Sequence, residues 1–194
     1  MKKILFALPL VALVMVWSTF ADNSWTTLWT GTESSTGTIA TGTKISPEAK
    51  AQIHQNWQTA KAEKKVAKGT FHVENGYLNF YFAPVTDKTA AQERRTTVKA
   101  AQDTLNNSKV QLKNDIKAWV KNKQPLSQET IYSRIDTMVD IWSSSVVKYV
   151  DSTKTDSYNT FIASKKALFK SIYGIHKTTV EKNKTIRQND KKAI

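Results

Sequence analysis

The sequence predicts a mainly α-helical fold: an antiparallel bundle of three to four long amphipathic helices, with one small β-hairpin at about 70–83 and a Thr/Ser/Gly-rich N-terminal leader. Three observations support this prediction. Apolar residues recur at helical spacing over most of the chain beyond residue 87. The connections between these stretches are short, which favours antiparallel neighbours. An Asn-Gly pair also separates two β-prone runs.

The first 21 residues have the layout of a Sec export signal. Two lysines precede an apolar run from Ile4 to Trp17, and small residues precede the expected cleavage point after Ala21. The run is shorter than the roughly 20 residues that span a bilayer, so we expect cleavage. The alternative is an uncleaved inner-membrane anchor through residues 4–20. In both cases the rest of the chain is expected in the periplasm or outside the cell.

Residues 22–45 form the predicted leader. Thr, Ser and Gly account for 14 of the residues from 22 to 43, a composition typical of linkers and irregular segments. Trp25 and Trp29 are costly to leave in water, so we expect them to dock on the body of the protein or on a partner. Residues 46–194 are predicted to form a single helical-bundle domain with the hairpin inserted in it.

A helix is expected from Pro47 to about Lys68. Ser46 precedes it as a capping residue, and Gly69 is its expected end. The hairpin should follow at about 70–83, with Asn-Gly as its type I′ turn. A two-stranded ribbon is marginal alone, so it should lie on a helix or accept a third strand from about 39–45.

Three further helices are expected, at about 87–123, 128–151 and 156–188. Pro125 ends the first of them, and Ser127 can cap the second. Each carries an apolar stripe at about 100° per residue. The three stripes hold, in order, Val98, Ala101, Leu105, Leu112, Ile116 and Trp119; Ile131, Ile135, Met138, Val139, Trp142, Val146 and Val150; and Phe161, Leu168, Ile172, Ile175 and Val180.

The sequence offers no constellation for catalysis, metals or cofactors. There is no cysteine, which excludes thiol catalysis and cysteine metal sites. The three histidines lack partners at ligand spacing, and no Gly-rich phosphate loop is present. Asp136 and Asp140 lie one helical turn apart, and we interpret them as a solvated face. We therefore expect a protein that is not an enzyme and has no cofactor or metal.

Positive charge is the one property with a spatial pattern. The formal charge is +13, and it becomes +11 if residues 1–21, which hold two lysines and no acid, are removed. Cations cluster beside the apolar stripe of the 87–123 helix and near the C-terminus, and these two surfaces would merge if the helices were antiparallel neighbours. The candidate residues for an anionic partner are Arg95, Lys99, Lys113, Lys117, Lys121, Lys182, Lys184 and Arg187.

Aromatic residues form a second candidate contact surface, with burial in the core as the alternative. Four of them fall within six positions of the expected hairpin and cannot all face one core. The candidate residues are Trp25, Trp29, Tyr77, Phe80, Tyr81 and Phe82.

These features predict an exported binding or structural protein of the bacterial cell envelope. Its expected partner is an anionic envelope surface or polymer, or another envelope protein, and association with membranes is compatible with its charge. Lysine outnumbers arginine, which disfavours sequence-specific recognition of nucleic acid. Two alternatives stay open: a subunit of a secretion, conjugation or phage-related envelope assembly, and an enzyme that acts on cell-wall glycan.

Overall fold

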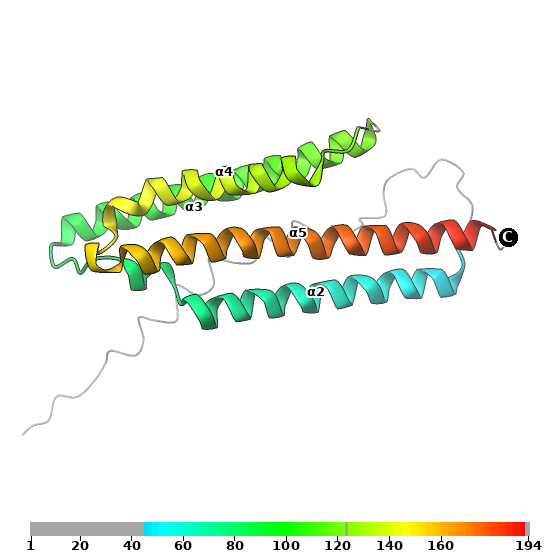
Figure 1. Cartoon of the computed structure of the whole chain (residues 1–194), viewed down its shortest axis with the longest axis horizontal. Coiled ribbons are helices and arrows are strands. Elements are labelled where there is room, and N and C mark those ends of the chain that lie inside the picture. Colours follow the sequence, from blue (N-terminus) through cyan, green and yellow to red (C-terminus); the bar gives the residue numbers. More distant parts are fainter. Residues whose placement is uncertain (1–44, 123, 193–194) are drawn as a thin grey trace, which may run out of the picture.

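The protein was analysed as a computed structural model that describes residues 45–122 and 124–192. This part of the chain is mainly helical, as predicted. Four long helices pack against each other, namely α2 (Pro47–Asn75), α3 (Lys88–Lys121), α4 (Gln128–Val146) and α5 (Thr155–Lys192). Each runs opposite to the one before it in the sequence (Figure 1). The predicted signal or anchor, and the leader apart from residue 45, lie outside the described residues.

The helix starts follow the predicted capping chemistry. Ser46 precedes α2, and its hydroxyl accepts a hydrogen bond from the Ala49 amide at 3.2 Å. Ser127 caps α4 in the same way through the Thr130 amide at 3.1 Å. At the start of α3, the Asp87 carboxylate accepts from the Ala90 amide at 2.7 Å. Each cap satisfies an amide that the first turn of a helix leaves without a partner.

The predicted β-hairpin is wrong. Helix α2 continues through Gly69 and ends at Asn75, and the next segment is a short 3₁₀ helix, η1 (Leu78–Tyr81). Gly76 has a φ of 66° and closes α2, so the left-handed conformation expected for a hairpin turn serves here as a helix end. Burial of Phe71, which is only 6% exposed, favours the longer helix.

A short strand-like pairing does occur elsewhere. The Ala83 amide donates to the Tyr149 carbonyl and the Asp151 amide donates to the Tyr81 carbonyl, both at 2.9 Å. This bridge ties the α2–α3 connection to the α4–α5 connection. The latter contains two 3₁₀ turns, η2 (Val147–Tyr149) and η3 (Ser152–Lys154). The described residues contain no β-strand, and the proposed third strand at 39–45 lies almost wholly outside them.

The core follows α5, which contacts both α2 and α4, while α3 packs on α4. Most positions of the three predicted stripes are buried or half-buried, and α4 buries all of its stripe from Ile131 to Val146. Two stripe positions are not in the core: Trp119 is 39% exposed and Val180 is 44% exposed. Figure 1 gives the reason, because the α3–α4 pair diverges from α5 toward the α3–α4 turn.

None of the helices within 45–122 and 124–192 is both long and apolar enough to cross a membrane.

Candidate functional site

A basic groove opens between α2 and the C-terminal part of α5. It has a volume of about 460 Å³, which falls in the range of small-molecule sites, about 300–1,000 Å³. The described residues that line it include three cations, two amides and one indole, and none of them is acidic. They are Trp57, Val180, Asn183, Lys184, Arg187, Gln188 and Lys191.

The cations form a row because of helical spacing. Lys184, Arg187 and Lys191 follow each other at intervals of three and four residues, which places them on one face of α5. With a rise of 1.5 Å per residue, the row and Val180 before it extend over roughly 16 Å. The groove therefore presents positive charge at successive turns of one helix.

The floor of the groove contains a buried amide. Asn183 is 5% exposed, and its carbonyl oxygen accepts a hydrogen bond from the Asn56 amide of α2 at 2.8 Å. Its own amide nitrogen has no acceptor among the described residues. An unsatisfied buried donor of this kind costs about 1–3 kcal/mol of stability.

Basic groups from three helices gather at the inner end of the groove. The rings of Trp57 on α2 and His176 on α5 lie 5.4 Å apart. Burial, and to a lesser extent the charges of Lys64 on α2 and Lys113 on α3, together lower the pKa of His176 to about 4. The imidazole is consequently neutral at pH 7, in surroundings that are already positive.

Lys64 is the most buried of these cations. It is 1% exposed, and its ammonium nitrogen has no hydrogen-bond partner among the described residues. Burial and, to a lesser extent, the charge of Lys68 lower the pKa of Lys64 to about 8, with Glu63 partly opposing the shift. An ammonium group in such surroundings favours a nearby anion.

Asp190, the acidic residue closest in sequence to the groove cations, bonds to Ser46 at the start of α2. Asp190 accepts hydrogen bonds from the Ser46 hydroxyl at 2.5 Å and from the Ser46 backbone amide at 3.0 Å. These bonds hold the pKa of Asp190 below its usual value. Asp190 thus joins the start of α2 to the end of α5 and does not line the groove with Arg187 and Lys191.

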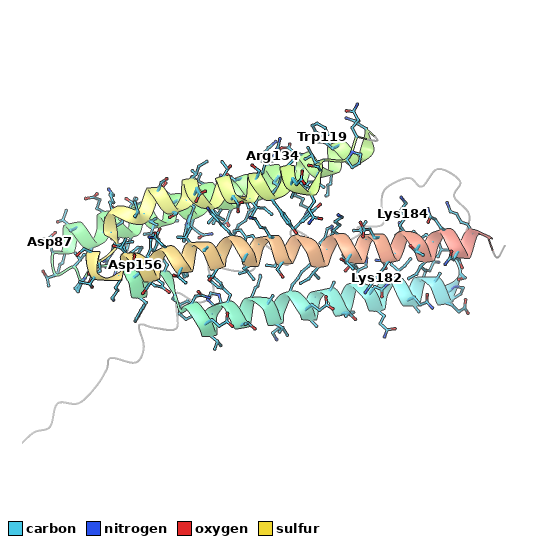
Figure 2. The ribbon with its side chains drawn as sticks, in the orientation of Figure 1. Asp87, Trp119, Arg134, Asp156, Lys182 and Lys184 are labelled. Atoms are coloured by element: carbon cyan, nitrogen blue, oxygen red, sulfur yellow. The ribbon has the colours of Figure 1, made fainter. Side chains whose placement is uncertain are left out.

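The predicted basic residues divide into separate surfaces. Lys184 and Arg187 line the groove, whereas Lys182 lines a small crevice on the other side of the α2–α5 contact. Figure 2 shows Lys182 and Lys184 leaving α5 on opposite sides, as their spacing of two residues requires.

None of the predicted α3 residues is among the described residues that line this groove. Arg95, Lys99 and Lys117 are exposed, and Lys113 is half-buried with its pKa lowered by burial and by Lys117. The side chain of Lys121 is outside the described part. The condition under which the two basic surfaces would merge is not met. Helix α3 packs on α4 and runs in the same direction as α5, and the α3–α4 pair diverges from α5 toward the groove end (Figure 1).

The predicted aromatic residues also divide. Tyr81 and Phe82 are buried, at 5% and 6% exposure, while Tyr77 and Phe80 are 62% and 65% exposed. The ring of Tyr77 stacks on His72 at 4.9 Å. These four residues lie at the end of the bundle remote from the groove, and Trp25 and Trp29 lie outside the described residues.

The two acids considered for catalysis hold helices together. Asp136 pairs with Lys170 at 2.7 Å and Asp140 with Lys166 at 2.6 Å, so both bridge α4 to α5. The part of the chain that the structure describes has no group of three or more His, Asp or Glu side chains that could hold a metal ion.

Sequence reasoning missed three important features of the groove. They are the place of Trp57 and of Lys191 in its lining and the burial of Lys64 behind it. Helical periodicity gives a residue's position on its own helix, but which neighbour that position meets depends on the packing of α2 on α5. Comparison with protein families, curated proteins and solved structures finds no match to this chain.

Proposed function

We propose that the protein is an exported, non-enzymatic binding protein of the bacterial cell envelope that holds an anionic partner in the groove between α2 and α5. One observation carries this proposal: Lys184, Arg187 and Lys191 line the same groove with no described acid among its lining residues. Positive groups at successive turns of one helix attract the same anion together.

The buried charges behind the groove support the same function. Lys64 and the residues near His176 keep the potential positive at the inner end, while Asp190 is engaged by Ser46. Arg95, Lys99 and Lys117 on α3 would add a weaker and less specific attraction, because they are not among the described residues that line the groove.

The test compares two triple variants that lose the same charge. Lys184→Ala, Arg187→Ala and Lys191→Ala are combined in one, and Arg95→Ala, Lys99→Ala and Lys117→Ala in the other. Binding of the full chain to phosphatidylglycerol vesicles, teichoic acid and duplex DNA is measured at low and moderate salt. We expect salt-sensitive binding to one of these probes, weakened at least about 10-fold by the groove variant and about 2-fold by the α3 variant.

Equal losses in both variants would show that net charge alone attracts the partner. Absence of salt-sensitive binding to any of the three probes would overturn the proposal itself.

A second candidate is a subunit of a larger envelope assembly. Val73, Tyr77 and Phe80 are 86%, 62% and 65% exposed at the end remote from the groove, and exposed apolar side chains of this size favour a protein contact. Gel filtration and pull-down of the full chain test this candidate. A stoichiometric complex with another protein would favour this second candidate over the groove-binding monomer, provided that the double variant Tyr77→Ser and Phe80→Ser no longer forms the complex.

A further inference from the structure

The lining of the groove combines three kinds of side chain that suit different parts of one ligand. Lys184, Arg187 and Lys191 provide charge, and Asn183 and Gln188 provide uncharged donors and acceptors. Trp57 provides an apolar ring at the inner end, where it lies against His176. A ligand that satisfies all three must carry negative charge, hydroxyl-like hydrogen-bonding groups and a flat apolar face.

From this combination we propose that the groove binds an acidic oligosaccharide, a short sugar chain that carries carboxylate or phosphate groups. This inference rests on the proposed function, because it specifies the class of anion held there. A sugar ring offers one apolar face for the indole of Trp57 and hydroxyl groups for the two amides. Its acidic groups would lie along the row of cations on α5.

The shape of the groove favours an extended chain over a single small anion. The row from Val180 to Lys191 covers roughly 16 Å of α5, which exceeds the reach of one phosphate or one monosaccharide. Gln188 lines the same groove and is exposed, so its side chain offers an accessible amide donor and carbonyl acceptor. The hydroxyl groups and ring oxygens of a sugar chain are neutral partners for such an amide.

Single-stranded nucleic acid is the main competitor, because it also combines phosphates with flat rings. Proteins that bind it without sequence preference stack successive bases on several aromatic side chains. Among the described lining residues of this groove, Trp57 is the sole aromatic one. Two amides and one indole therefore fit a sugar chain better than a row of bases.

The test uses probes that share a charge of about −5 and differ in what carries it. Binding of the full chain is measured by calorimetry to pentagalacturonate, to blocked pentaglutamate and to the oligonucleotide (dT)₆, with neutral maltopentaose as a fourth probe. We expect pentagalacturonate to bind at least about 10-fold more tightly than pentaglutamate and (dT)₆, and maltopentaose to bind weakly. Pentaglutamate binding as tight as that of pentagalacturonate would overturn the sugar inference while leaving an anion-binding groove.

Two variants connect this preference to named side chains. Trp57→Phe and Gln188→Ala should each reduce the advantage of pentagalacturonate over pentaglutamate at least about 3-fold, with pentaglutamate binding unchanged. Gln188 is exposed, so Gln188→Ala tests the idea without disturbing the fold. An unchanged ratio in both variants, or tighter binding of (dT)₆ than of pentagalacturonate, would contradict the inference. Failure of every anionic probe would instead contradict the proposed function.

Discussion

The two halves of α5 pack by different chemistry. The first half buries rings and aliphatic groups, whereas the buried positions of the second half include Thr179 and Asn183. Phe161 shows the contrast best: its ring lies 5.4 Å from Phe71 and 5.0 Å from Tyr81. At the other end, Trp57 and His176 make one ring contact beside an open groove. The aromatic packing is therefore concentrated at one end of the bundle, and the open groove with its proposed binding function lies at the other.

The two ends also differ in the surroundings of their lysine ammonium groups. The Lys165 ammonium lies 4.5 Å from the centre of the Trp142 ring and 5.6 Å from that of Phe161, so aromatic faces neutralise part of its cost of burial. The Lys64 ammonium is more buried and has no hydrogen-bond partner among the described residues. The charge of Lys64 is therefore compensated less well than that of Lys165, which agrees with the proposed anion-binding site.

The largest loss of stability is expected when the ring of Phe161, at the centre of the aromatic end, is removed. Phe161→Ala should lower the free energy of unfolding by about 3–5 kcal/mol, because it opens a cavity among close-packed rings. Trp57→Ala should cost about 1–2 kcal/mol, since this ring is only half-buried. Urea unfolding followed by circular dichroism measures both. Equal costs would mean that the groove end carries as much of the stability as the aromatic end.

Lowering the pH should destabilise the protein through His176 at the basic end. Burial and the charges of Lys64 and Lys113 lower the pKa of His176 to about 4 from its usual 6.5. As the pH falls from 6.5 to 4, the unfolded chain takes up this proton before the folded chain does, so stability falls. We expect a loss of about 2–3 kcal/mol at 1.36 kcal/mol per pKa unit, reduced by partial exposure.

His176→Gln provides the control for this prediction, because glutamine does not titrate. The variant should show a smaller slope of unfolding free energy against pH between 6.5 and 4, whatever its stability at pH 7. Identical slopes in the two proteins would assign the acid sensitivity to other groups.

Replacement of Lys64 by an uncharged residue should stabilise the fold, while it removes a positive charge behind the proposed anion site. Lys64→Met keeps the length of the side chain and removes a poorly compensated buried charge, so the free energy of unfolding should rise by about 1–2 kcal/mol at pH 7. The matched control is Lys61→Met on the exposed face of α2, where a change within about 0.5 kcal/mol is expected. Destabilisation by Lys64→Met would show that the ammonium group is well compensated in the folded protein.

Local sequence patterns predicted helices better than their contacts. In α4, the cap at Ser127 and the whole stripe from Ile131 to Val146 were predicted correctly, because both depend on short-range spacing. The Asn75-Gly76 pair gave a wrong prediction because a positive φ at glycine serves a helix end as well as a hairpin turn. What chose between the two outcomes was burial of Phe71 against α5, a long-range contact.

The residues of the groove also show that local sequence patterns do not predict contacts between helices. Lys184 and Arg187 were candidates because charge is visible in the sequence. Their position in one groove with Trp57 follows from the α2–α5 contact, and their separation from the α3 cations follows from the packing of α3 on α4. The burial of Lys64 had no local signal, since lysine at a helix position is normally exposed.

The smallest expected effect concerns the contact that closes the groove end. Ser46 and Ser127 both cap a helix, but the side chain and backbone of Ser46 also donate to Asp190 on α5. Each Ser→Ala change should cost about 1 kcal/mol for the lost cap. Ser46→Ala should cost about 0.5–1 kcal/mol more, for the lost hydroxyl bond to a carboxylate.

The same variant should also weaken the groove, because an Asp190 carboxylate with one bond fewer can turn toward Arg187 and Lys191. We therefore expect Ser46→Ala to bind pentagalacturonate about 2–3-fold more weakly, with Ser127→Ala unchanged. Addition of Asp190→Asn to Ser46→Ala should restore the affinity, since the competing charge is removed. If affinity stays low in the double variant, Ser46 supports the groove by positioning α2 on α5 and not by holding Asp190.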